Sequence, residues 1–271
     1  KQTKTNKNLH YYLVTEAVLV STTAVTQAVD AARLGVTMIE HHYAYAESAL
    51  DRQVQNFNPT YNYNDENERF RQAGKVWTQT NKKRLLTEVV DSLIYYGVTM
   101  LPTRVVYEAN RDIIRAQSLP WHKKYTHQLL IERNGPDPNY HGAYHYNWTS
   151  DDEYYWSKAF NLWGDLIFEF NKKGGRVAYG TDDSYIFATP GFSNIRELQL
   201  LRETGMHTLE VLKSATLNCL FKCFNDNKTT ILIPHLNKQC YGNPFLEKWY
   251  NTKSQTELYN HIVLEDDDFV K

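Results

Sequence analysis

Three short clusters of imidazole, hydroxyl and carboxylate side chains are candidates for chemistry. They are Glu40-His41-His42, Pro102-Thr103-Arg104 and Thr181-Asp182-Asp183. Imidazole and carboxylate groups that converge from separate segments can form a zinc-type hydrolytic site, in which the metal acidifies a bound water. A carboxylate such as Asp182 could take the proton of that water and pass it to the leaving group. In the alternative interpretation, the two histidines only end a strand and Asp182 caps the turn that follows.

Each cluster directly follows a predicted strand. These strands are residues 36–39, 98–101 and 176–180, and each comes after a predicted helix that ends at a glycine. An earlier apolar, β-branched run at residues 13–20 predicts a fourth strand. Helices and strands that alternate at this spacing predict an α/β fold with a parallel sheet and right-handed crossovers. The carboxyl ends of parallel strands share one edge, so we expect the three clusters to lie together there.

Apolar residues at helical spacing predict the helices that accompany these strands. The apolar stripes span residues 24–32, 85–94 and 156–170, and two later helices are predicted at 193–204 and 208–220, the last capped by Thr208. The connections at 42–84 and 104–152 are rich in Tyr, Asn, Asp and His and are long for loops of a compact domain. We interpret them as insertions that carry short helices and build the wall of a pocket. The alternative is a pair of poorly ordered surface excursions.

Five motifs occur in a characteristic order along the chain. They are Ile39-Glu40-His41, Leu101-Pro102-Thr103, Gly180-Thr181-Asp182, Arg196-Glu197-Leu198 and Ala215-Thr216-x-Asn218. In this order the chain resembles the amidohydrolase superfamily, and within it the imidazolonepropionase- and prolidase-like branch. The resemblance covers about residues 13–220, and residues 191–220 carry its most specific part.

The resemblance implies a fold, an activity and a set of site residues. The fold would be a partial (β/α)8 barrel covering about the last four βα units, with long insertions in its βα loops. The activity would be metal-dependent hydrolysis of an amide-like C–N bond in a small substrate. His41 and Asp182 would bind the divalent metal, with zinc as the first candidate, and Asp182 would also act as general acid and base. Arg104 and His141 would contact the substrate.

The metal ligands that the resemblance implies are incomplete in this chain. No H-x-H pair occurs in its 271 residues, and residues 15–23 contain no histidine. Two interpretations therefore stay open. In the first, a second chain or a missing N-terminal half completes the barrel and supplies further ligands. In the second, the chain is a degenerate, metal-free relative that acts as a structural or binding subunit.

The composition is that of an ordinary soluble globular protein. Hydrophobic residues make up 42% of the chain and charged residues 23%, and 30 Lys and Arg balance 31 Asp and Glu. The balanced charge argues against nucleic-acid and membrane-surface partners. No apolar run approaches the roughly 20 residues of a membrane helix, and the first residues do not form a signal peptide. We expect one domain at 1–220, followed by a polar tail at 221–271, and the compartment stays open.

Overall fold

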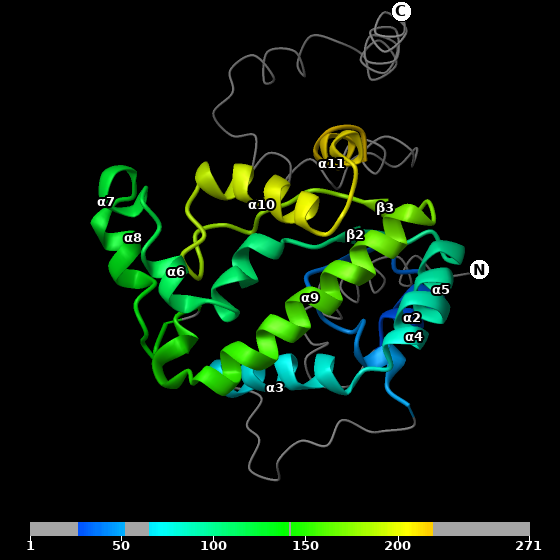
Figure 1. Cartoon of the computed structure of the whole chain (residues 1–271), viewed down its shortest axis with the longest axis horizontal. Coiled ribbons are helices and arrows are strands. Elements are labelled where there is room, and N and C mark those ends of the chain that lie inside the picture. Colours follow the sequence, from blue (N-terminus) through cyan, green and yellow to red (C-terminus); the bar gives the residue numbers. More distant parts are fainter. Residues whose placement is uncertain (1–26, 52–64, 141, 219–271) are drawn as a thin grey trace, which may run out of the picture. The chain divides into compact units, whose positions relative to one another are not determined.

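The computed structural model describes residues 27–51, 65–140 and 142–218, which include a three-stranded parallel sheet (Figure 1). The strands are β1 (Met38–Glu40), β2 (Thr99–Leu101) and β3 (Arg176–Val177), and their order in the sheet is β1-β2-β3. In the register, Ile39 lies opposite Met100, which in turn lies opposite Val177. The predicted α/β class and parallel sheet are confirmed. The strand predicted at 13–20 and the tail predicted at 221–271 lie outside the described residues.

Helices account for most of the regular structure in this part of the chain. They are α2 (Ala28–Arg33), η2 (Glu47–Ala49), α3 (Glu66–Gln79), α4 (Lys82–Arg84), the π-helical η3 (Leu85–Val89), α5 (Val90–Tyr95), η4 (Arg104–Asn110), α6 (Ile113–Gln117), α7 (His122–Tyr125), α8 (Gln128–Arg133), η5 (Tyr144–Asn147), α9 (Ser150–Lys172), α10 (Phe192–Glu203) and α11 (Thr208–Ala215). The stripe predicted at 85–94 spans η3 and most of α5. α11 begins at Thr208, as predicted, but the side chain of His207 caps it instead of that of Thr208, and the helix ends at Ala215.

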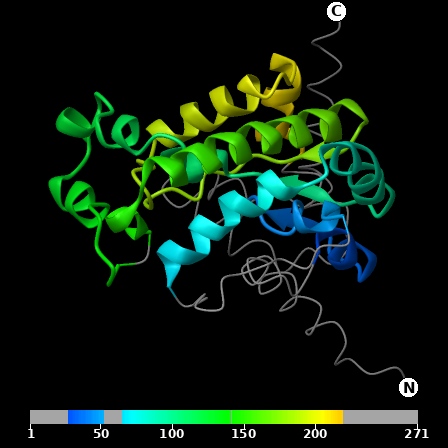
Figure 2. The same cartoon turned by 60° about the horizontal axis from the view of Figure 1, so that its bottom comes forward.

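The helices that connect successive strands lie beside one another. α5 connects β1 to β2 and α9 connects β2 to β3, and α5 contacts both α9 and the preceding α2. The helices therefore follow one another in the same order as the strands. This is the sequential arrangement expected when each crossover has the same hand. α9 also runs along α3, as Figure 2 shows.

The core forms around the apolar stripe of α9, as the sequence predicts. Trp156, Phe160, Trp163, Ile167 and Phe170 are all fully buried. The apolar stripe of α9 packs closely against α3 at Gly74. A Cβ added at this position would lie only 2.8 Å from the indole Cδ1 of Trp156. Glycine at this position lets the backbone of α3 approach α9.

Both predicted insertions carry helices and contribute to the core. The first contains η2, α3 and α4, and the second contains η4, α6, α7, α8 and η5. Val105 and Tyr107 of η4 and Tyr144 of η5 are buried. The described parts of both insertions are therefore packed into the fold, and the alternative of poorly ordered surface excursions does not apply to them.

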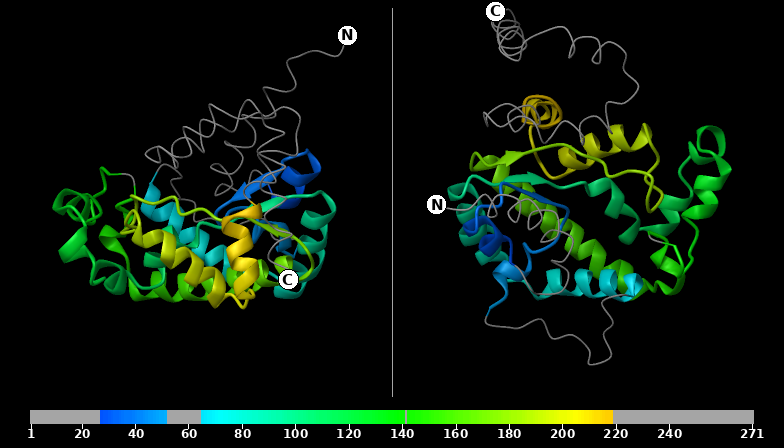
Figure 3. Two further views of the ribbon diagram at one scale, coloured as in Figure 1. Left: turned by 90° about the horizontal axis from the view of Figure 1, so that it is seen from above. Right: turned by 180° about the vertical axis from the view of Figure 1, so that it is seen from behind.

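The outer edge of β3 is covered by the last helical segment. The side-chain amide of Asn218 donates to the carbonyl of Val177 over 2.8 Å, and the N–H of Tyr179 donates to the carbonyl of Ser214 over 3.1 Å. The residue between them, Ala178, donates to Met100 of β2. Alternate residues of a parallel strand point to opposite neighbours, so Val177 and Tyr179 present their backbone groups away from β2. The segment that contains α11 thus occupies the place of a further strand (Figure 3).

The helices of the described residues can be compared with the length and hydropathy of a membrane-spanning helix. None of the helices in the described residues combines the length and the apolar character needed to cross a bilayer.

Candidate functional site

A residue with a left-handed backbone lies within five positions of the end of each strand. His41 follows β1 with φ 64°, Thr103 lies just beyond β2 with φ 50°, and Asp182 lies beyond β3 with φ 47°. Residues other than glycine rarely adopt this conformation, and such positions are concentrated at functional sites, where the surrounding structure holds them. All three come from the clusters that the sequence singles out.

The three side chains form a chain of contacts that spans the strand ends. His41 Nδ1 lies 2.5 Å from the hydroxyl of Thr103, and His41 Nε2 lies 3.8 Å from Oδ2 of Asp182. His41 and Thr103 are buried, whereas the side chain of Asp182 is 46% exposed. The sequence-predicted pair of His41 and Asp182 is thus brought together, with Asp182 on the solvent side.

Burial keeps the imidazole of His41 neutral. It lowers the pKa of His41 to about 4, because the surrounding protein disfavours the charged form. A neutral imidazole is the form that binds metal ions. Burial likewise raises the pKa of Asp183, whose carboxylate accepts a hydrogen bond from the Thr181 hydroxyl over 3.3 Å.

The spacing of His41 and Asp182 fits two ligands of one metal ion. At 3.8 Å their facing atoms are too far apart for a direct hydrogen bond. Ligand atoms bound about 2.0–2.2 Å from a zinc ion can span such a gap. Among the described residues, no group of three or more His, Cys, Asp or Glu side chains could hold a metal ion. The pair therefore fits part of a ligand set, and the rest would have to come from outside these residues.

Two tyrosines that the sequence interpretation does not single out lie beside this pair. The ring centroid of Tyr107 is 5.5 Å from that of His41, and that of Tyr43 is 6.0 Å away. Burial raises the pKa of Tyr107 well above its usual value, and a hydrogen bond with Tyr43 and the charge of Asp182 add to this effect. Tyr43 and Tyr107 belong to the two Tyr-rich insertions, and this richness in tyrosine is the sequence feature that points to them.

The neighbouring His42 packs among aromatic rings. Its ring centroid lies 4.6 Å from that of Tyr107 and 4.9 Å from that of Trp156. Burial lowers the pKa of His42 well below its usual value, and the nearby His41 lowers it further. His42 is therefore a neutral part of the core.

Arg104 is directed into the helical layer. Its guanidinium carbon lies 4.0 Å from the ring centroid of Phe160 and 5.1 Å from that of Trp163. Burial lowers the pKa of Arg104 to about 9, and the charge of Glu197 opposes this shift. The structure does not bring Arg104 to the His41–Asp182 pair. The second residue predicted to contact substrate, His141, lies outside the described residues.

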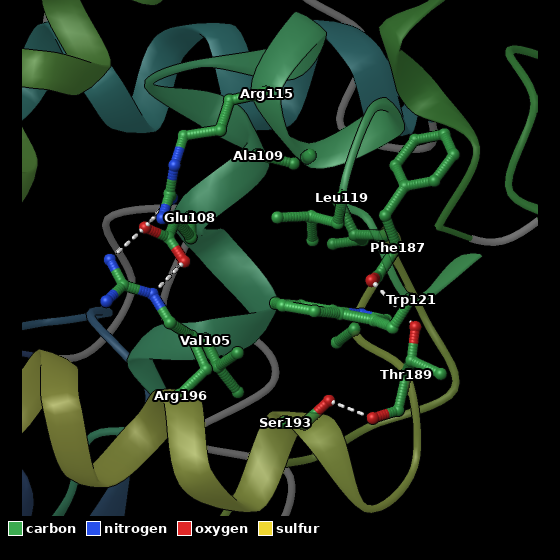
Figure 4. A pocket seen from close by; sticks show the side chains of 13 residues that line it. Val105, Glu108, Ala109, Arg115, Leu119, Trp121, Phe187, Thr189, Ser193 and Arg196 are labelled. Carbon is green, nitrogen blue, oxygen red and sulfur yellow. Dashed lines mark hydrogen bonds and ion pairs between the residues drawn. The ribbon is translucent and has the colours of Figure 1, made fainter. Parts of the chain in front are cut away.

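Cavities formed by the described residues include two that lie away from the His41–Asp182 pair, and neither is lined by His41 or Asp182. An open cleft of about 420 Å³ at the start of α3 is lined by polar side chains such as Asp65, Glu66 and Tyr140. A second cavity, between η4 and α10, measures about 20 Å³ and has Trp121, Phe187 and the ion pairs of Glu108 around it (Figure 4). That is space for about one water molecule and not for a substrate.

Comparison of the chain with protein-family models, with curated proteins and with solved structures found no match.

Proposed function

We propose that the chain carries part of the active site of a metal-dependent hydrolase of the amidohydrolase type, which cleaves an amide-like C–N bond in a small substrate. The observation that supports this proposal best is the convergence of His41 and Asp182. His41 follows the outer strand β1 and Asp182 lies beyond the other outer strand, β3, yet their facing atoms are 3.8 Å apart.

In this proposal each side chain of the pair has its own task. Nε2 of His41 and Oδ2 of Asp182 would hold a divalent metal, and zinc is the first candidate. When bound, the metal would acidify a water molecule at neutral pH. Asp182 would take the proton of that water on its carboxylate and give it to the leaving nitrogen. Its half-exposed side chain can reach a substrate, whereas buried His41 serves as a fixed ligand.

The remaining ligands would come from residues outside the described part or from a second chain. Catalytic zinc sites normally use three protein ligands, so the described pair needs at least one more. We infer a partial (β/α)8 barrel, since the strand order β1-β2-β3 and the matching order of α2, α5 and α9 are those of a barrel segment. Because Asn218 and Ser214 occupy the outer edge of β3, a further strand can join only beside β1 in this arrangement, and a closed barrel would require this segment to leave the edge of β3.

The second candidate is a metal-free relative that acts as a structural or binding subunit. One observation favours it, which is that the described residues offer two potential ligands and no third. A left-handed Asp182 next to a buried histidine would then be a scaffold feature without a catalytic task.

Metal content separates the two candidates. The 271-residue chain is purified without chelator, and bound zinc, manganese and iron are measured by elemental mass spectrometry. The variants are His41→Gln and Asp182→Asn. Their matched controls are His127→Gln, at an exposed helix cap, and Asp183→Asn, the adjacent carboxylate.

Metal close to one ion per chain that is lost in both site variants and kept in both controls supports the hydrolase. The same preparation should then release amine from a panel of N-acyl amino acids, dipeptides and lactams. A folded chain without metal, even after incubation with zinc, contradicts a hydrolase whose ligands all lie in this chain and favours the structural subunit.

A further inference from the structure

We propose that Thr103 is a positioning residue, whose hydroxyl fixes the tautomer of His41 so that the lone pair of Nε2 is presented to Asp182. The inference deepens the proposed function because it concerns the same pair, but its test does not depend on a bound metal.

The argument starts from the single proton of the Thr103 hydroxyl. That hydroxyl donates to the carbonyl of Pro102 over 2.7 Å. Its proton is then engaged, so in the 2.5 Å contact with His41 the oxygen of Thr103 must accept and Nδ1 must donate. The carbonyl of Pro102 thus determines the direction of the next hydrogen bond.

A neutral imidazole carries one N–H, so protonation of Nδ1 leaves a lone pair on Nε2. Nε2 is the atom that lies 3.8 Å from Asp182. Two acceptors then face each other across this gap, which is the arrangement that a cation between them would stabilise. Histidine ligands generally donate their second ring N–H to a fixed acceptor, which sets the tautomer and the ring orientation.

The backbone explains why these two side chains meet. β1 and β2 pair with Glu40 opposite Leu101, and the N–H of His41 donates to the carbonyl of Leu101 over 2.9 Å. The ladder therefore brings His41 next to the turn that holds Thr103. Thr103 is β-branched and left-handed, a combination that costs energy and that the fold nevertheless maintains.

A threonine next to a histidine could also be a nucleophile, but the surroundings of Thr103 argue against this role. A nucleophile after a strand needs free backbone N–H groups that stabilise an oxyanion. Here the carboxylate of buried Glu197 accepts from the N–H of Val105 over 2.7 Å, and it also accepts from the N–H of Arg104. These donors are already occupied.

The first test reads the tautomer directly. The full chain is labelled with ¹⁵N-histidine and treated with chelator, and the ring nitrogens of His41 are observed by long-range ¹H–¹⁵N correlation at pH 7.5. The His41→Gln variant identifies the signals. We expect Nδ1 to be protonated and Nε2 to be unprotonated. Protonation at Nε2 in the wild-type chain would overturn the inference, and this measurement needs no variant of Thr103 that folds.

The second test uses two variants that separate the hydroxyl from the shape of the side chain. Thr103→Val keeps the branched shape but removes the acceptor, so we expect the proton to move to Nε2, where Asp182 can accept it. Thr103→Ser keeps the hydroxyl and should keep the wild-type tautomer. If Thr103→Val retains a proton on Nδ1, the hydroxyl does not set the tautomer and the inference fails.

Zinc titration of the same variants distinguishes this inference from the proposed function. If the wild-type chain binds zinc, Thr103→Val should weaken the affinity about 10- to 100-fold, while Thr103→Ser stays near wild type. If neither the wild-type chain nor any variant binds zinc but the tautomer moves as expected, the positioning role of Thr103 stands and a hydrolase whose ligands all lie in this chain is wrong.

Discussion

Glu108 and Arg196 form a two-point ion pair that joins η4 to α10. Arg196 donates through Nε to one carboxylate oxygen of Glu108 over 2.8 Å and through Nη2 to the other over 2.6 Å. Arg115 donates to the same carboxylate (Figure 4). Arg111 donates to it as well. Burial alone would raise the pKa of Glu108, but the hydrogen bonds from Arg196 and Arg111 and their charges lower it to about 2. One carboxylate thus holds three guanidinium groups near the strand ends.

The low pKa of Glu108 predicts a loss of stability in acid. The group has a pKa of about 2 in the folded chain and an ordinary value of 4.5. Its contribution is therefore complete above pH 4.5 and is lost as the pH falls towards 2. The shift corresponds to about 3 kcal/mol of unfolding free energy. Urea denaturation between pH 3 and 7 should show that the free energy of unfolding of Glu108→Gln is lower than that of wild type and depends less on pH.

The control for this experiment is Glu203→Gln. Glu203 also pairs with Arg196 and Arg111, but its side chain is 45% exposed. Exposed pairs contribute about 0–1 kcal/mol, so this variant should stay close to wild type. Equal stability of Glu108→Gln and wild type at pH 7 would refute the assigned role of Glu108.

A second prediction concerns Arg104 and Glu197, two buried charged groups that influence each other electrostatically. Burial raises the pKa of Glu197 to about 7, and the positive charge of Arg104 is among the groups that limit this rise. Arg104→Met should destabilise the chain by about 1–3 kcal/mol, because it removes the hydrogen bond to the carbonyl of Phe160 and a positive charge that acts on the buried carboxylate of Glu197. A raised pKa means a contribution that is present below pH 4.5 and is lost as the pH rises through 7, so the variant should suffer more at pH 8 than at pH 5.

The double variant Arg104→Met with Glu197→Gln tests the coupling of this pair. It should recover part of the stability at pH 8, since no buried charge remains. Zinc binding by Arg104→Met, measured where it is folded, should match that of wild type, because Arg104 is directed into the helical layer. A selective loss of zinc with unchanged stability would place Arg104 in the site after all.

The strands and the main helical stripe could be predicted because their signals are local. A glycine that ends a helix precedes each predicted strand, and the strands of the structure overlap the predicted ranges 36–39, 98–101 and 176–180, although β1 extends one residue further, to Glu40. The apolar spacing from Trp156 to Phe170 identifies the buried face of α9, and every residue of that stripe is buried. Such patterns depend on residues only a few positions apart.

The direction of side chains after a strand could not be predicted, because it depends on the backbone angle of a single residue. Thr103 is left-handed and η4 begins at the next residue, so Arg104 enters the helical layer, although it lies only three residues beyond β2. The approach of Tyr107 to His41 depends on the same turn. Spacing in the sequence brings His41 and Asp182 to one edge, but it contains no information on these angles.

A third prediction concerns the edge of β3. Asn218→Ala removes the donor to the carbonyl of Val177, a fully buried residue. A buried carbonyl left without a partner costs about 1–3 kcal/mol. Hydrogen–deuterium exchange should show faster exchange at the amide of Tyr179, which bonds to Ser214 nearby. The exposed Thr216→Ala is the control and should leave that amide protected. Unchanged exchange in Asn218→Ala would mean that this segment does not cover the edge.

A fourth prediction concerns backbone strain in the loop that carries Asp182. Asp182, Ser184, Ile186 and Phe187 all have positive φ, and Ser184 has φ 79°. Its N–H donates to the carbonyl of Ala188 over 2.9 Å, a bond that any residue at 184 except proline can make. A left-handed conformation costs a non-glycine residue about 1–2 kcal/mol. Replacement by glycine removes this cost, but the greater freedom of glycine in the unfolded chain offsets part of the gain.

Ser184→Gly should therefore be more stable than Ser184→Ala by about 1 kcal/mol, since alanine loses the hydroxyl but keeps the strain. Both variants lack the serine oxygen, so their difference isolates the backbone term. Urea denaturation at pH 7 measures it. If Ser184→Ala is as stable as Ser184→Gly, the left-handed turn at Ser184 does not strain the chain. A stable Ser184→Gly that binds less zinc than wild type would show that the strained loop serves to hold Asp182 towards His41.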